Sequence, residues 1–186
     1  LLLDTDYIVK NKLLLRSFEY EGVAMFDNAM SITNLKPHQN ETLLYDQGIK
    51  MWWSTVVYFD RSDFSKMFFD LWAHVADNYQ FYQFLYNFPG KLFRTDYCVS
   101  IAVHILSGME ESNIIHNFDD EPMYFISQHD DVIDANNIQD WICLGNNREE
   151  TWKDIVVKHS NLDLHVMNKR ALLRVKPKIM EHFNDR

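Results

Sequence analysis

The chain has few of the residues that mark fibrous, disordered and disulfide-rich proteins. Its 186 residues include only 5 Gly, 4 Pro and 2 Cys. So few Gly and Pro exclude a collagen-like or low-complexity chain. Two cysteines are too few for a disulfide framework, which favours a reducing compartment and predicts a cytoplasmic location. Because 47% of the residues are hydrophobic, we expect a single α/β domain over residues 1–186 with a substantial core.

Long apolar runs and an excess of positive charge are also missing. No run approaches the roughly 20 apolar residues of a membrane span, so the sequence predicts a soluble protein without one. The formal net charge is −9, the wrong sign for binding nucleic acid through counterion release. Residues 158–186 nevertheless hold seven Lys or Arg against three Asp or Glu. Such a basic C-terminal segment suits either a bound phosphate or a solvated surface.

The sequence opens without Met, directly on the apolar run Leu1–Leu3. This run predicts a short buried strand, whose sheet neighbours would be supplied by sequence upstream. We therefore expect the chain to be a fragment of a longer protein. An incomplete sheet would expose an edge strand, so we also expect copies of the chain to associate through that edge.

Segments with strand-like and helix-like patterns alternate along the chain, which predicts an α/β fold with a mixed, largely parallel central sheet flanked by helices. Residues 51–59 are rich in β-formers and predict a central strand. Ser62 is expected to cap one long amphipathic helix that ends near residues 88–90. Thr95 is expected to cap a second helix, which stops at Gly108. The other expected elements are a helix at 10–18, a strand with loops at 22–33, a loop at 34–40, strands at 123–127, 154–158 and 162–167, a helix at 169–175 and a last helix from Pro177.

Two carboxylates follow the first predicted strand. Asp4 and Asp6 are separated by one residue, and a turn can bend both side chains towards one hard cation. Carboxylate oxygens suit Mg²⁺ or Mn²⁺, and such an ion could neutralise a diphosphate in a protein of net negative charge. Acidic turns without a metal are common, so this pair alone is a weak signal.

A histidine lies near the end of the last predicted strand, and a lysine follows it four residues later. His165 stands where an imidazole could complete a metal site, and Lys169 could reach the phosphates of the same ligand as a point charge. The alternative is a half-buried histidine and a solvated lysine.

Asp96 falls in the first turn of a predicted helix, where the helix dipole favours its ionised form. An ionised carboxylate can orient or deprotonate a hydroxyl. The alternative is that Asp96 stabilises its own helix while Arg94 lies in solvent.

The order of these segments resembles the metal-dependent glycosyltransferases of the GT-A fold, within the nucleotide-diphospho-sugar transferase superfamily. Residues 1–9 look like that family's apolar strand with its D-x-D motif, and residues 53–60 look like the later strand over the donor sugar. Residues 93–97 stand where the family often places an acidic residue at a helix start. Residues 165–169 resemble the late histidine and lysine of the glycogenin-like branch, although the Gly and Pro-Trp residues of that motif are absent. The chain would match the C-terminal two-thirds of such an enzyme, without the part that binds the nucleotide base.

The resemblance implies transfer of a sugar from a nucleoside diphosphate sugar to an acceptor, with Mn²⁺ or Mg²⁺ as cofactor. It implies that Asp4, Asp6 and His165 hold the metal, and that Lys169 binds the leaving diphosphate.

The same resemblance assigns four residues to the sugars. Arg94, Trp53 and Thr55 would contact the substrate, and Asp96 would orient the acceptor hydroxyl or act as a base.

Two other interpretations stay open. Haloacid-dehalogenase-like phosphatases also begin with an apolar strand and Asp-x-Asp, but their lysine precedes a later acidic pair, whereas Lys169 follows the pairs at 119–120 and 130–131. The chain also fits a non-catalytic α/β interaction module or an inactive truncated remnant. Binding of a divalent cation would count against the interaction module.

Overall fold

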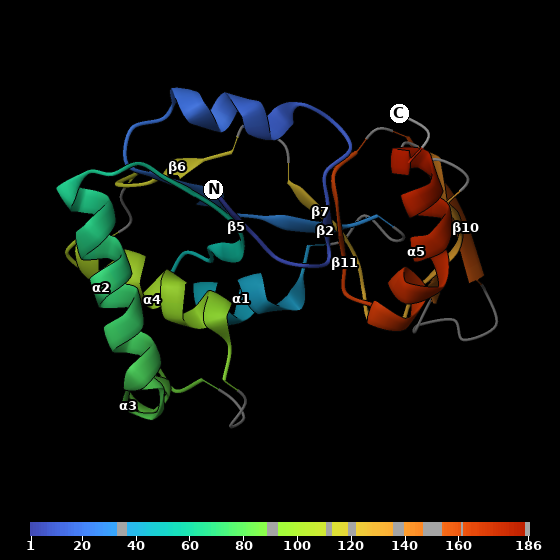
Figure 1. The fold of residues 1–186 in the computed structure, drawn as a ribbon. Helices are drawn as coiled ribbons and strands as arrows, with labels where there is room; N and C mark the ends of the chain where they lie inside the picture. Colours follow the sequence, from blue (N-terminus) through green and yellow to red (C-terminus); the bar gives the residue numbers. More distant parts are fainter. Residues whose placement is uncertain are drawn as a thin grey trace. The chain divides into compact units, whose positions relative to one another are not determined.

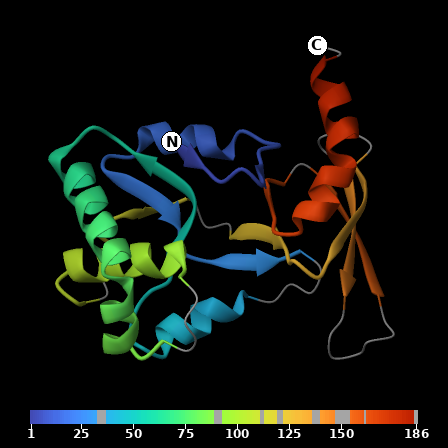
Figure 2. The same cartoon turned by 60° about the horizontal axis from the view of Figure 1, so that its bottom comes forward.

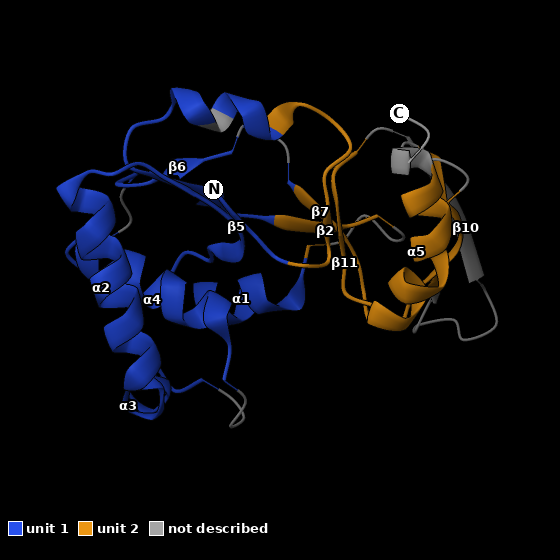
Figure 3. Ribbon diagram, in the orientation of Figure 1, with its two compact units in different colours: residues 1–4, 14–28, 38–122 blue, residues 5–13, 29–37, 123–186 orange. Residues whose placement is uncertain are grey.

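The structure is a computed structural model of the chain. It describes residues 1–32, 37–88, 93–110, 113–118, 122–135, 140–146, 154–160 and 162–184. The chain forms two compact units (Figure 3). Unit 1 comprises residues 1–4, 14–28 and 38–122, and unit 2 comprises residues 5–13, 29–37 and 123–186. Each unit is therefore built from several separate segments. The single domain over residues 1–186 stays a prediction, since two compact units can still fold as one domain.

Unit 1 contains a four-stranded sheet of strands β1 (Leu2–Leu3), β5 (Trp53–Phe59), β3 (Val23–Phe26) and β6 (His116–Asn117), in that order. Strand β5 pairs antiparallel with β1 and β3, and β3 pairs parallel with β6. The prediction of a central strand within residues 51–59 is confirmed as β5. Its β-branched and aromatic residues suit a strand that is covered on its faces.

The prediction of a buried strand at Leu1–Leu3 is wrong in one respect. Strand β1 forms, but it lies at the edge of the sheet, and the three leucines are 43–47% exposed. Apolar composition alone cannot separate an edge strand from a central one, because the number of sheet neighbours is decided by tertiary structure.

Helices α2 (Asp63–Asp77) and α4 (Thr95–Leu106) pack against each other in unit 1, and α4 also packs on β5 (Figure 1). As predicted, Ser62 caps α2, since its hydroxyl accepts the N–H of Ser65 at 3.2 Å. The core of this region consists of Val23, Met25, Trp52, Val57, Phe68, Val99, Val103 and Ile115.

Three predictions about the helices of unit 1 are corrected. The long helix predicted after Ser62 is two helices, because α2 ends before Asn78 and α3 (Tyr79–Leu85) follows it. The predicted end at residues 88–90 lies in part outside the described residues. Thr95 is the first residue of α4 and not its cap; Arg94 takes the cap position without a side-chain hydrogen bond to the helix. Gly108, with φ of +78°, follows the end of α4 as expected.

Two further helical segments complete unit 1. The helix predicted at 10–18 is a 3₁₀ helix, η1 (Leu13–Glu19), which begins in unit 2 and lies mostly in unit 1. Helix α1 (Gln39–Tyr45) begins inside the loop predicted at 34–40, where residues 34–36 lie outside the described chain.

Unit 2 contains two sheets. One has the order β2 (Tyr7–Ile8), β11 (Leu164–Val166), β7 (Met123–Ile126) and β4 (Ala29–Ser31). The other is an antiparallel meander of β8 (Asp131–Ala135), β9 (Asp140–Asn146) and β10 (Asp154–Ser160). Helix α5 (Lys169–Asn184) lies alongside this second sheet in both views (Figure 1, Figure 2).

Helix α5 is one continuous helix, so the prediction that a last helix begins at Pro177 is wrong; Pro177 lies inside it. The helix buries Ala171, Val175 and Ile179, which repeat every four residues and share one face. They join a core that includes Trp141 of β9. Burial of this face outweighs the hydrogen bond that proline removes.

The α/β class and the mixed sheets with flanking helices are confirmed. The sheets are not largely parallel, because five of the eight strand pairings in the described chain are antiparallel. No helix in the described ranges is long and apolar enough to cross a membrane.

Candidate metal centre

The pairing of β2 with β11 places Asp6 beside His165. Tyr7 lies opposite His165 in this antiparallel pair, and the N–H of Val166 donates to the carbonyl oxygen of Asp6 at 2.9 Å. Asp6 itself lies in the turn before β2, so the strict alternation of a strand does not fix its side chain. On its other side β11 pairs parallel with β7. The backbone of the site is therefore held from both sides within unit 2.

Asp6 has two cationic or potentially cationic neighbours. His165 Nε2 lies 3.3 Å from Asp6 Oδ1, and Lys169 Nζ donates to Asp6 Oδ2. The carboxylate of Asp6 is only 3% exposed, whereas the side chain of Lys169 is 61% exposed. A buried carboxylate is thus met by an imidazole from the same sheet and by an ammonium group that reaches it from the surface.

The electrostatics of this group keep Asp6 ionised. Burial is the largest single influence and raises the pKa of Asp6. The hydrogen bonds and charges of His165 and Lys169 together outweigh burial and hold the pKa well below its ordinary value. Asp6 therefore offers a full negative charge near neutral pH, the form that binds a cation.

Asn168 fixes the position from which Lys169 reaches Asp6. Its Oδ1 accepts the N–H of Ala171 at 3.0 Å, which caps the first turn of α5, and its Nδ2 donates to the carbonyl of Asp130 at 2.8 Å. Lys169 is the first residue of α5. The cap therefore sets where the lysine side chain begins.

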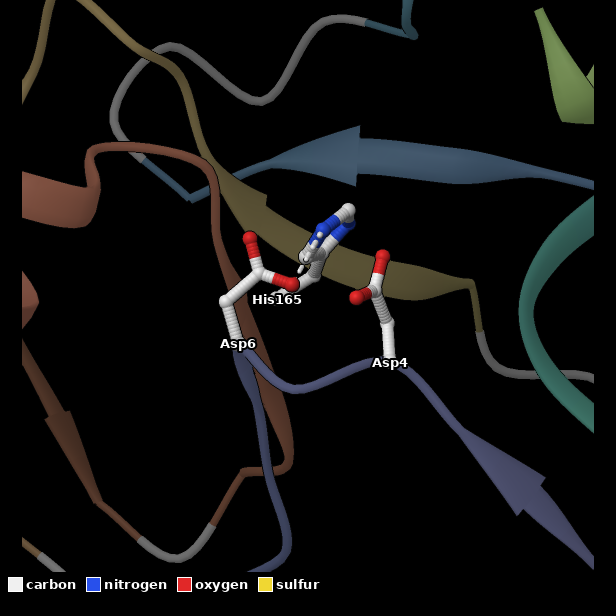
Figure 4. Close-up of side chains that lie close together, drawn as sticks. All are labelled: Asp4, Asp6 and His165. Atoms are coloured by element: carbon white, nitrogen blue, oxygen red, sulfur yellow. Dashed lines mark ion pairs between the residues drawn. The ribbon is translucent and has the colours of Figure 1, made fainter.

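Asp4 completes a possible ligand set. It stands two residues before Asp6, and its N–H donates to the carbonyl of Thr55 at 2.8 Å. One ligand atom each from Asp4, Asp6 and His165 lies within 4.8 Å of the others (Figure 4). Ligands that share one ion at about 2.0–2.6 Å lie at most about 5 Å apart. Two carboxylates and an imidazole can thus hold a divalent cation, and that they do so stays a prediction.

A second polar group lies in unit 1 around Asp96. Asp96 Oδ1 accepts the backbone N–H of Ser54 at 3.0 Å and its hydroxyl at 2.7 Å, while Oδ2 lies 3.3 Å from Arg94 Nη2. In the orientation that satisfies both groups, the amide oxygen of Asn40 accepts from Arg94 Nη2 at 2.8 Å and from Nε at 3.1 Å. Arg94 is thus held between Asn40 and Asp96.

Trp53 and Thr55, the other residues assigned to the substrate, are 1% and 3% exposed. The indole N–H of Trp53 donates to Glu41 Oε1 at 3.2 Å, and His38 meets its ring edge-on with centroids 4.9 Å apart. Trp53 is thus packed inside unit 1, and its ring is not open for stacking on a sugar.

The structure brings together Asp6, His165 and Lys169 in one group and Arg94 and Asp96 in another. Sequence reasoning missed the residues that hold these groups in place, Ser54, Asn40 and Asn168. Asn168 had a usable signal, because Asn directly before a helix is a common N-cap. Ser54 and Asn40 had none, since their contacts join separate elements.

Comparison of the chain with models of protein families, with curated proteins and with solved structures finds no match. The GT-A resemblance therefore rests on the motifs alone. The function has to be argued from the geometry of the site.

Proposed function

We propose that the chain carries the metal- and diphosphate-binding part of a glycosyltransferase that uses a nucleoside diphosphate sugar. One observation carries this proposal: an ionised, buried aspartate, a histidine and a lysine from distant parts of the sequence meet in unit 2. A diphosphate leaving group needs both a hard cation and further positive charge. In this group Asp6 and His165 offer ligands for the cation, and Lys169 offers the further positive charge.

In this proposal Asp4, Asp6 and His165 hold Mn²⁺ or Mg²⁺. The bound ion would neutralise the negative charge that develops on the diphosphate as the sugar leaves. Lys169 would add a point charge on the same phosphates. The ion would thereby let a protein of net charge −9 bind a polyanionic donor.

Asp96 is the proposed residue for the acceptor hydroxyl. Its Oδ1 already accepts two hydrogen bonds from Ser54, and Arg94 neutralises Oδ2. These contacts hold the carboxylate in place and favour a role in orienting a hydroxyl. Arg94 would hold Asp96 and contact the substrate, while the buried Trp53 and Thr55 would shape the wall behind it.

Thermal melting with combinations of ligands tests the proposal, because binding to the native state raises its stability. The chain would be melted with Mn²⁺, Mg²⁺ or no metal, each with and without UDP or GDP. We expect the metal to raise the melting temperature, the nucleoside diphosphate to add to the rise only when the metal is present, and the Asp4→Asn/Asp6→Asn double variant to lose both effects. Asp134→Asn changes a half-buried carboxylate of unit 2 that pairs with Lys178 and serves as the control.

Two results would contradict the proposal. A melting temperature that no metal changes would remove the metal site and favour a non-catalytic interaction module. A metal effect that survives intact in the double variant would place the ion elsewhere in the chain.

A further inference from the structure

We propose that Lys169 is a built-in substitute for the metal ion: its ammonium group neutralises Asp6 when no metal is bound, and metal binding releases it to the diphosphate. This inference rests on the proposed function and adds a fixed order of binding to it. The metal enters first, and the diphosphate follows on the metal and the released lysine.

The burial of the two partners supports this role. Asp6 is only 3% exposed, and a buried carboxylate without a counter-charge is strongly unfavourable. Lys169 is 61% exposed, so its ammonium group can leave Asp6 for water at little cost. Loss of the ion pair would therefore cost much more free energy at Asp6 than at Lys169. Any other cation that satisfies Asp6 frees the lysine.

The contact also puts the lysine in competition with the ion. Lys169 Nζ donates to Oδ2 of Asp6, the same carboxylate whose Oδ1 lies 3.3 Å from His165 Nε2. A divalent cation bound by Asp6 and His165 would stand within a few ångströms of the ammonium group and repel it. The lysine and the ion therefore compete for this carboxylate, and the presence of one weakens the binding of the other.

The released lysine has one evident destination. Lys169 is the first residue of α5, and the cap from Asn168 fixes the first turn of that helix. Only the flexible side chain of Lys169 therefore has to move. An ammonium group beside a bound divalent cation is repelled until an anion bridges the two charges. A diphosphate has oxygens enough to contact both. The same side chain thus weakens the binding of metal alone and strengthens the binding of metal with diphosphate.

Acetylation of lysine amines, read by mass spectrometry, follows the position of Lys169 directly. Mn²⁺ is expected to raise the acetylation rate of Lys169 about fivefold, because the released amine loses its carboxylate partner. Inorganic pyrophosphate added with Mn²⁺ should lower the rate again. Lys176, an exposed residue of the same helix, should react equally under all three conditions.

Mn²⁺ titration of three variants supplies the second readout. Lys169→Met is expected to bind Mn²⁺ alone roughly fivefold more tightly than the wild type and to lose the further tightening by pyrophosphate. Arg170→Met removes the same charge from the next residue, which is exposed, and should change the affinity less than about twofold. Asp6→Asn should bind no Mn²⁺ at this site.

The outcomes separate the two proposals. Equal Mn²⁺ affinity of the wild type and Lys169→Met, with no response of Lys169 to acetylation, would overturn the substitute role and leave the metal site standing. Equal effects of Lys169→Met and Arg170→Met would also overturn it, because general charge would then explain the change. Absence of Mn²⁺ binding in both the wild type and Lys169→Met would overturn the proposed function and this inference together.

Discussion

Two aspartates lie close to a helix start, and their partners differ. In unit 2 Asp6 contacts the imidazole of His165 and the ammonium group of Lys169, the first residue of α5. In unit 1 Asp96, in the first turn of α4, accepts the backbone N–H and the hydroxyl of Ser54 and pairs with Arg94. Both carboxylates are largely buried and both have a basic residue beside them.

The difference lies in how easily each partner is exchanged. The backbone N–H of Ser54 cannot move away from Asp96 without disturbing β5, so this contact of Asp96 is fixed. Lys169 can leave Asp6 by rotating its own side chain, and an imidazole can bind a metal through the nitrogen that faces the carboxylate. A carboxylate whose cationic partners can be exchanged is suited to binding a metal ion. A carboxylate held by backbone and hydroxyl donors is suited to a role in which its oxygens stay in one place.

The largest expected effect separates the two aspartates by metal affinity. His165→Ala should weaken Mn²⁺ binding about 100-fold, close to 2.7 kcal/mol, because one of three protein ligands is lost. Asp96→Asn should leave the affinity within about twofold. Calorimetric titration measures both, with His129→Ala as a control for loss of an exposed histidine of unit 2. A large loss of affinity in Asp96→Asn would remove the distinction between the two groups.

The second effect concerns the fixed position of the Asp96 group. Ser100 Oγ accepts the N–H of Trp52 at 2.8 Å and donates to the carbonyl of Asp96 at 2.7 Å, which ties α4 to the start of β5. Ser100→Ala leaves the buried N–H of Trp52 without this partner, so we expect a loss of about 2 kcal/mol in the free energy of unfolding. Urea denaturation measures it, and Ser107→Ala at the end of α4 is the milder control. The Mn²⁺ affinity should not change.

The third effect tests the cap that positions Lys169. Asn168→Ala removes the acceptor for the N–H of Ala171 and should cost about 1 kcal/mol of stability. Asn168→Asp retains an acceptor at this position and should keep most of the stability, since a negative charge also suits a helix N-terminus. Equal losses in the two variants by urea denaturation would show that the cap is not what Asn168 contributes.

The smallest effect is a pH dependence in unit 2. Lys10 Nζ lies 4.2 Å from the centre of the Trp141 ring, and burial lowers the pKa of Lys10 from 10.5 to about 8. Between these two values the unfolded chain binds a proton that the folded chain does not. Lys10 therefore makes the free energy of unfolding rise with pH across this window.

Lys10→Met should remove that rise. The measurement is the difference between the variant and the wild type in urea denaturation from pH 7.5 to 10. Subtraction is needed because groups such as Cys98, whose pKa burial raises to about 12, make the free energy of unfolding fall with pH in both proteins. A difference that does not vary with pH would mean that Lys10 is ionised in the same way in the folded and unfolded chains.

The sequence predicted the ligand group better than its surroundings. Asp4 and Asp6 are near neighbours in sequence, and His165 lies in a late strand, so a local pattern together with the family resemblance named the three residues. The contact of Ser54 with Asp96 could not be predicted, because it depends on how α4 packs against β5.

The missed elements have physical reasons. Strand β8 contains Asp131 and Asp134, which look like loop residues in the sequence. In the structure they form ion pairs with Arg174 and Lys178 of α5, and these pairs explain acidic residues in a strand. Helix α1 was missed because its cap is His38, which is not a usual capping residue. The acidic residues of β8 have partners far along the chain, whereas the cap of α1 lies in the local sequence but uses an uncommon capping residue.

Titration of Mn²⁺ followed by its electron paramagnetic resonance signal tests the metal centre most directly, because the signal of the free ion falls as the ion binds. Wild type, Asp6→Asn and the control variant Asp134→Asn would be compared, with circular dichroism to establish that each is folded. We expect one bound ion in the wild type and in Asp134→Asn, and none at this site in Asp6→Asn. Unchanged binding in a folded Asp6→Asn variant would contradict the assignment of the centre to Asp4, Asp6 and His165.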